Sequence, residues 1–236
     1  MRHQFTFYID PSAISGDEVY FNSGETHHIR NVLRLQNGQE IIATDGTGWE
    51  FHIILQDPDK EHQRGKIVKR EILEETPPLP VSITIPCLKG ERWLFAVEIA
   101  CELGVQKIIP VNFVLSQAKW TETRLQKAKK KAIECLKQSG GAFLTQVEEP
   151  DDLTGVLQRN SSTEIWFAHQ KGRQNSVIRA DTLIIVGPES GLDDSEVKIL
   201  TDLNARSFYL GSRRLRSEIA VAAVLGQISS NFMNTK

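Results

Sequence analysis

Long apolar runs are missing from this sequence: none approaches the roughly 18 residues that a membrane-spanning helix requires. The first five residues lack the apolar segment and small-residue cleavage site of a secretory signal, so we expect a cytoplasmic protein. Three cysteines occur among 236 residues, and none forms a C-x-x-C pair. This count is typical of reduced thiols and disfavours both a disulfide framework and a zinc site. We therefore expect no membrane contact and no bound metal.

A strong net charge is also missing. The 28 Lys and Arg residues nearly balance 30 Asp and Glu residues, and a net charge of −2 does not by itself indicate a nucleic-acid partner. The distribution is less even, because residues 119–137 contain seven basic residues and two Glu. Such a run is typical of a solvated helix face, but clustered cations also bind RNA phosphates by releasing counterions. The lysines expected to carry such contacts are Lys127, Lys130 and Lys131.

The N-terminal part has the pattern of short strands joined by turns. Strands are predicted at residues 5–9, 40–44, 50–55 and 66–69, with a hairpin turn at residues 45–48. One helix is expected at residues 24–32, starting near Ser23. Closely spaced strands of this kind predict a small β-barrel. Pro77, Pro78 and Pro80 then interrupt regular structure, which places the domain boundary near residue 75, between domains 1–74 and 75–236.

After these prolines, strands and helices alternate. Strands are predicted at residues 81–85, 107–111, 164–168, 182–186 and 207–210, and helices at residues 91–103, 121–138, 193–203 and 217–231, the last capped by Ser217. The segment 182–186 is almost fully apolar, which indicates a strand buried on both faces. Alternating elements of this kind predict an α/β domain built on a parallel sheet.

Two loops of this domain have the composition of a ligand site. Residues 186–192 and 210–217 each follow a predicted strand, and ligands of open parallel sheets bind beyond the carboxyl ends of the strands. Glycines let the backbone approach a ligand closely, and three arginines before a helix N-terminus suit an anion or RNA. Ordinary turn glycines and a solvated basic loop would explain either loop alone. Two such loops on successive strands favour a ligand site.

The order of motifs along nearly the whole chain resembles that of the RsmE family in the SPOUT superfamily. The two C-terminal motifs are Gly187-Pro188-Glu189-x-Gly191-Leu192 and Leu210-Gly211-x-Arg213-x-Leu215-Arg216-x-Glu218-x-Ala220. The two motifs nearer the N-terminus are His28-x-x-x-Val32-Leu33-Arg34 and Glu102-Leu103-Gly104-Val105. Members of this family are bacterial enzymes that methylate N3 of one uridine in 16S ribosomal RNA.

The resemblance implies a PUA-like β-barrel followed by a SPOUT domain whose parallel sheet carries a trefoil knot and a homodimer interface near residues 183–232. It implies S-adenosylmethionine as cofactor and the small ribosomal subunit as partner. The residues expected to contact the cofactor are His169, Gly187, Pro188, Glu189, Gly191, Leu210, Gly211, Leu215, Arg216 and Ser217. The residues expected to contact RNA, besides the three lysines, are His28, Arg30, Arg34, Arg213 and Arg214. Arg216 and Glu218 are the expected catalytic residues.

Several positions depart from the family pattern. Ser190, Ser212 and Ile219 lie inside the two C-terminal motifs, and the segments 116–118 and 137–141 differ more widely. These departures keep two alternatives open. One is an RNA-binding or ribosome-assembly factor that retains the fold without transferring methyl groups. The other is a methyltransferase of related fold that acts on another RNA.

Overall fold

The chain folds as two units, which the computed structural model describes over residues 6–59, 62–73, 78–173 and 181–233. Unit 1 contains residues 1–76 together with residues 133–144, and unit 2 contains residues 77–132 and 145–236. The sequence predicted a single boundary near residue 75, and it did not predict that residues 133–144 belong to unit 1. The predicted linker lies partly in residues 74–77, outside the described residues. No described helix has the length and apolarity needed to cross a membrane.

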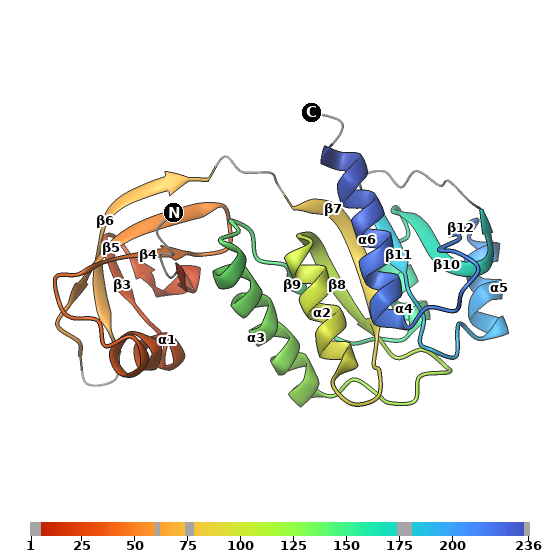
Figure 1. The fold of residues 1–236 in the computed structure, drawn as a ribbon, viewed down its shortest axis with the longest axis horizontal. Helices are drawn as coiled ribbons and strands as arrows, with labels where there is room; N and C mark the ends of the chain where they lie inside the picture. Colours follow the sequence, from red (N-terminus) through yellow and green to blue (C-terminus); the bar gives the residue numbers. More distant parts are fainter. Residues whose placement is uncertain (1–5, 60–61, 74–77, 174–180, 234–236) are drawn as a thin grey trace. The chain divides into compact units, whose positions relative to one another are not determined.

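Unit 1 is built on a curled sheet of six strands in the order β1-β4-β5-β6-β3-β2, drawn in red to yellow in Figure 1. The predicted turn at residues 45–48 joins two antiparallel neighbours, and every second residue of the longer one, including Phe51, Ile53 and Leu55, is buried in the barrel core. The strands are β1 (Thr6–Tyr8), β2 (Ile14–Ser15), β3 (Glu18–Tyr20), β4 (Glu40–Thr44), β5 (Trp49–Gln56) and β6 (Arg64–Ile72).

The predicted helix of unit 1 begins one residue earlier than expected. Asn22, not Ser23, is the N-cap, because its side chain accepts a hydrogen bond from the backbone N–H of Glu25. The helix α1 (Ser23–His27) continues directly into a π-helical turn at His28–Val32. A short 3-10 turn, Pro11–Ala13, lies between β1 and β2.

Unit 2 contains the predicted parallel sheet, with strand order β12-β10-β11-β7-β8-β9. Every pairing in it is parallel, so all carboxyl ends lie at one edge. Its strands are β7 (Leu79–Pro86), β8 (Val105–Val111), β9 (Gln146–Val147), β10 (Glu164–Arg173), β11 (Thr182–Ile185) and β12 (Arg206–Phe208). Its helices are α2 (Arg92–Glu102), α3 (Glu122–Ser139, whose last residues belong to unit 1), α4 (Leu153–Arg159), α5 (Asp194–Asp202) and α6 (Ser217–Met233).

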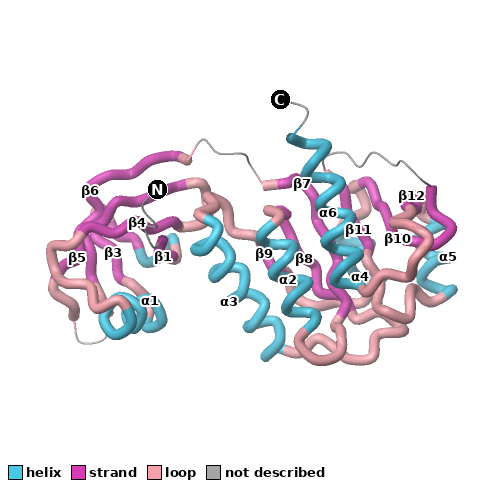
Figure 2. The backbone as a smooth tube through the Cα atoms, viewed as in Figure 1, coloured by secondary structure: helices cyan, strands magenta, loops and turns pink. Residues whose placement is uncertain are grey.

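Two hydrophobic cores cover the two faces of this sheet. Ile184 packs in the core that contains residues of α2 and α6, whereas its neighbours Leu183 and Ile185 pack in the core that contains residues of α4 and α5. Figure 2 shows α2 and α6 side by side on one face of these strands. All four residues of β11 are buried, which confirms the prediction of a strand covered on both faces.

Three local predictions about unit 2 were wrong. β10 does not end at Ala168 but continues through a register shift to Arg173 beside β12. The short α4 and β9 were missed, because each offers too few residues for a period to be recognised. Ser217 does not cap α6; it is the first residue of the helix, and its hydroxyl donates to the carbonyl of Gly187.

Candidate functional site

The two glycine-containing loops meet at the carboxyl edge of the sheet in unit 2. They follow β11 and β12, which pair with opposite sides of β10. Between them lies a cavity of about 430 Å³. Its walls are formed by Ala168, His169, Gln170, Val186, Gly187, Pro188, Glu189, Ser190, Gly191, Leu192, Tyr209, Leu210, Gly211, Arg213, Arg214, Leu215, Ser217 and Ala220. This is the edge at which an open parallel sheet binds its ligands.

The loop after β11 requires glycine at two positions for different reasons. A Cβ atom at Gly187 would lie 2.9 Å from Cδ2 of Leu192, so the turn closes tightly only without a side chain. Gly191 has a φ of 87°, where an L side chain is strained, and its N–H donates to the carbonyl of Pro188 at 2.8 Å. The result is a tight loop whose backbone faces the cavity.

The loop after β12 leaves its backbone open at Gly211. Gly211 has a φ of 117°, and no heavy atom lies within 4 Å of the position that a Cβ would take. A ligand can therefore approach this backbone closely. The Ser217 hydroxyl reaches the Gly187 carbonyl at 2.8 Å and so ties the second loop to the first.

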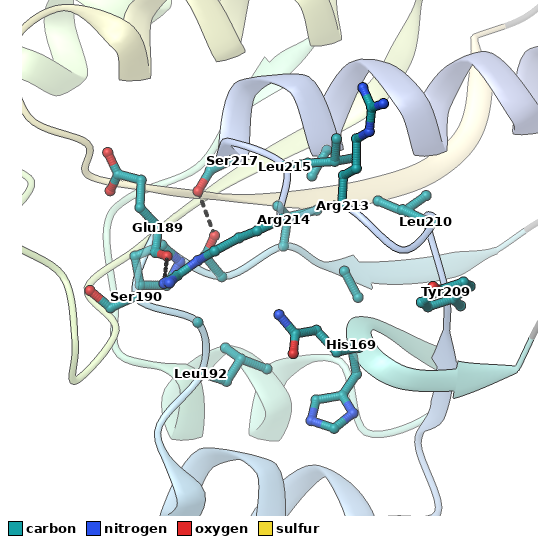
Figure 3. Close-up of a pocket in the computed structure, with 18 residues that line it drawn as sticks. His169, Glu189, Ser190, Leu192, Tyr209, Leu210, Arg213, Arg214, Leu215 and Ser217 are labelled. Carbon is teal, nitrogen blue, oxygen red and sulfur yellow. Dashed lines mark hydrogen bonds between the residues drawn. The ribbon is translucent and has the colours of Figure 1, made fainter.

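The three arginines of the second loop have different surroundings. The Arg214 guanidinium donates to the backbone carbonyl of Glu189, whereas Arg213 points away from that residue (Figure 3). Arg216 is exposed and does not line the cavity, although its neighbours Leu215 and Ser217 do. Arg214 is therefore engaged in holding the loops together. Arg213 is exposed at the rim of the cavity, whose wall it helps to form, and Arg216 is exposed beside it.

The carboxylates of the site are held by a residue that the sequence did not indicate. Arg92, at the start of α2, forms an ion pair with Glu189 and lies 3.9 Å from Glu218. Glu218 is buried, with 4% of its surface exposed, and does not line the cavity. The structure therefore places neither expected catalytic side chain, Arg216 or Glu218, on the cavity wall of the single chain.

The other predicted cofactor residues come together around the cavity. They are His169, Gly187, Pro188, Glu189, Gly191, Leu210, Gly211, Leu215 and Ser217. His169 was expected just beyond a strand; it instead lies within β10, where the register shift occurs, and still reaches the wall. Gln170 was missed because β10 was expected to end before it. Tyr209 was missed although it directly precedes a predicted contact residue.

The residues expected to contact RNA are spread over both units. In unit 1, His28 is half-buried with its ring 5.8 Å from that of Phe7, the Arg30 side chain donates to Gln63, and Arg34 is exposed. On α3, Lys127 and Lys130 are exposed and form no ion pair with any described carboxylate. Lys131 lies 3.5 Å from Glu98. The helix thus presents two lysines whose charge is not matched locally.

Comparison with known proteins gives these two units a family. The RNA methyltransferase domain family matches residues 75–229, and the RNA methyltransferase PUA domain family matches residues 21–68. The ribosomal RNA small subunit methyltransferase E of Bacillus subtilis is 27% identical over 234 residues, which cover 92% of this chain and 89% of that protein.

Solved structures show the same fold. A predicted RNA methyltransferase from Thermotoga maritima superimposes with a TM-score of 0.75 at 28% identity, covering 97% of this chain and 99% of that one. The ribosomal RNA small subunit methyltransferase E of Neisseria gonorrhoeae, solved with bound S-adenosylmethionine, gives a TM-score of 0.84 at 23% identity, covering 97% and 98%. Unit 1 is therefore a PUA-like half-barrel, unit 2 carries the methyltransferase fold, and the chain belongs to the RNA methyltransferase family.

Proposed function

We propose that this protein uses S-adenosylmethionine to methylate N3 of a uridine in the 16S ribosomal RNA of the small subunit. The observation that carries the proposal is the cavity between the two glycine-containing loops, in a chain of the RNA methyltransferase family. The specific substrate rests on the motifs of the RsmE family and on relatives named ribosomal RNA small subunit methyltransferase E. A cytoplasmic place of action follows from a ribosomal substrate.

The cavity fits a cofactor of this kind. Its volume of about 430 Å³ lies in the range of small-molecule sites. Gly191 and Gly211 leave open backbone at the wall, so amide and carbonyl groups can contact a polar ligand directly. Leu192, Leu210 and Leu215 supply apolar surface on the same wall. Polar backbone next to apolar side chains suits a ligand that carries a nucleoside and a charged chain.

The chemistry requires the protein to make uridine N3 nucleophilic. When bound, S-adenosylmethionine supplies a methyl group on a positively charged sulfur. N3 of uridine carries a proton, so the site must favour loss of that proton and hold the base in line with the methyl group. A cation beside O2 or O4 stabilises the negative charge that develops on the base. Arg216 is our candidate for this cation, and Arg213 is the competing one, because both are exposed, Arg213 on the cavity wall and Arg216 beside it.

Glu218 is less suited to removing the proton than the sequence suggested. Its carboxylate is buried away from the cavity wall and lies beside Arg92. We therefore assign it a supporting role, and in this proposal water takes the proton from N3. The target base must be unstacked from the RNA to enter the cavity, as in other enzymes that modify bases. Lys127, Lys130 and the PUA-like unit are proposed to hold the RNA backbone.

The proposal is tested in cells that lack this protein. Mass spectrometry of their 16S ribosomal RNA should show one uridine without its N3 methyl group, and the wild-type gene should restore it. Calorimetry with S-adenosylmethionine on the purified protein should show binding. Absence of binding would support the alternative of a non-catalytic RNA-binding factor. A missing methyl group on another RNA would instead identify a methyltransferase with a different substrate.

A further inference from the structure

Arg92 connects two segments of the cofactor cavity without lining it. Its Nη2 atom forms an ion pair with Oε1 of Glu189, in the loop after β11. Its Nη1 atom lies 3.9 Å from Oε1 of Glu218, in the first turn of α6. The two terminal nitrogens of one guanidinium therefore face two carboxylates that belong to different segments. A planar fork of donors can do this, whereas a lysine ammonium is a single point of charge.

Glu218 depends on this arrangement because it is buried. Only 4% of its surface is exposed, and its Oε2 atom has no hydrogen-bond partner among the described residues. A carboxylate removed from water is destabilising unless opposite charge lies nearby. Two sources of positive potential are present: the Arg92 guanidinium and the N-terminus of α6, where helix dipoles favour a negative side chain.

Glu189 is held at both its side chain and its backbone. Arg92 binds its carboxylate, and Arg214 donates to its carbonyl oxygen. The neighbouring Ser217 hydroxyl donates to the carbonyl of Gly187 at 2.8 Å. These bonds join the loop after β11, the loop before α6 and the start of α2. Glu189 lines the cavity and Glu218 directly follows the lining residue Ser217, so the positions of these two carboxylates bear on the shape of the wall.

We propose that Arg92 is a positioning residue for cofactor binding. This role rests on the function proposed above. Acting through Glu189 and Glu218, it holds the two loops in the arrangement that binds S-adenosylmethionine before the cofactor arrives. A site organised in advance binds more tightly because less ordering accompanies binding. The residue contributes to cofactor affinity and not to recognition of RNA.

The test compares three single variants by calorimetry with S-adenosylmethionine and by steady-state kinetics. Arg92→Met should weaken cofactor binding by about tenfold or more, the scale of a lost hydrogen bond between charged groups. Arg92→Lys should fall between Arg92→Met and wild type, because it keeps the charge and loses the fork. Arg159→Met removes the last residue of α4, an arginine that pairs with Asp151 away from the cavity, and this variant should bind like wild type. The KM for RNA should not change in any of them.

A double variant separates positioning from simple support of the fold. Arg92→Met leaves the Glu218 carboxylate buried without its cation and should lower the melting temperature. Adding Glu218→Gln removes the buried charge and should restore much of that stability. Cofactor binding should stay weak in the double variant, because the Glu189 carboxylate has still lost its ion pair with Arg92. Recovery of affinity together with stability would overturn the positioning role.

The remaining outcomes are also decisive. If wild type binds S-adenosylmethionine and Arg92→Met binds it equally well, the positioning role is wrong while the proposed function stands. If wild type itself does not bind the cofactor, the proposed function fails and the positioning role fails with it.

Discussion

The two units of this protein build their candidate functional surfaces in different ways. In unit 2 the cavity combines open backbone with side chains, and Gly191 and Gly211 adopt conformations that favour glycine. In unit 1 the surface of the barrel carries paired side-chain charges, as where His52 lies 2.7 Å from Glu40 and 3.3 Å from Glu71. A site that depends on backbone conformation tolerates few substitutions. On a charged surface, each substitution changes the binding strength by only a small amount.

This difference predicts that substitutions will have two kinds of effect. Changes at the cavity should act on cofactor binding or on turnover, and changes at charged surfaces should act on RNA affinity and its salt dependence. The following variants test that division.

The largest effect is expected at the arginines beside the cavity. Arg216→Ala should lower single-turnover rates by about 100-fold or more, the scale seen when one charge-stabilising donor is lost. Cofactor affinity, measured by calorimetry, should change little, because the backbone at Gly187, Leu210 and Gly211 remains. Arg213→Ala is the matched comparison. Normal turnover in Arg216→Ala with a large loss in Arg213→Ala would transfer the role to Arg213, and a loss of stability with affinity would make Arg216 a structural residue.

Substituting a glycine should have different effects in the two units. Gly211→Ala places a side chain at a φ of 117°, so we expect cofactor binding to weaken by about tenfold, corresponding to a strain of about 1–3 kcal/mol. Gly65→Ala in the barrel would bring a Cβ to 2.3 Å from Cγ2 of Ile53, so we expect lower stability, by about 1–3 kcal/mol, with unchanged cofactor affinity. Calorimetry and thermal unfolding of both variants check this. Equal effects of the two on affinity would contradict the division between units.

The lysines of α3 should contribute to RNA affinity by charge alone. Replacing Lys127, Lys130 and Lys131 with Gln should weaken RNA binding several-fold and flatten its dependence on salt, since fewer counterions are released. Lys131 should contribute least, because Glu98 already lies beside it. Lys198→Gln on α5, where the lysine pairs with Asp202, is the control. An unchanged salt slope in the triple variant would make this helix an ordinary solvated face.

We predict a homodimer that uses α6. Ala220 and Ile228 of this helix are buried in the core of their own unit. Among the side chains of α6 whose burial is described, the exposed large apolar one is Ile219, with 45% of its surface, beside the half-buried Ala222 and Ala223. Light scattering should give twice the monomer mass, and Ile219→Asp should reduce it, while Leu203→Asp on the end of α5 should not. A monomer mass for wild type at micromolar concentration would contradict the dimer. The trefoil knot stays a prediction as well.

The smallest effect concerns pH and the charged face of unit 1. A hydrogen bond with Glu40 raises the pKa of His52, and Glu71 and Glu50 act in the same direction, partly opposed by burial. A raised folded-state pKa means that protonated His52 contributes stability below its unfolded value of about 6.5, and this contribution is lost as pH rises through the higher folded value. His52→Gln should therefore destabilise the protein more in acid than in base, by a small amount because the half-buried ion pairs are still partly screened by water. Thermal unfolding against a His27→Gln control measures it, and a pH-independent difference would contradict the assignment.

The predictions that succeeded rest on patterns formed by residues close together in the sequence. Gly187, Gly191 and Gly211 follow apolar strands directly, so their place at the carboxyl edge follows from the pattern alone. The buried β11 was predicted for the same reason, because its residues are apolar on both faces. The prediction that β10 ends at Ala168 failed because a register shift is set by the partner strand β12 and not by local sequence.

The α/β order of unit 2, the barrel pattern of unit 1 and the two loops that form the cavity all follow from local patterns in the chain. The packing of distant elements, in contrast, decided that Arg92 faces Glu189 and Glu218, residues 97 and 126 positions later in the chain. It also decided that Glu218 is buried, that Arg216 extends into solvent and that residues 133–144 pack with the barrel. The physical reason is that periodicity reports which face of an element is apolar. Which charges meet across elements depends on how those faces pack together.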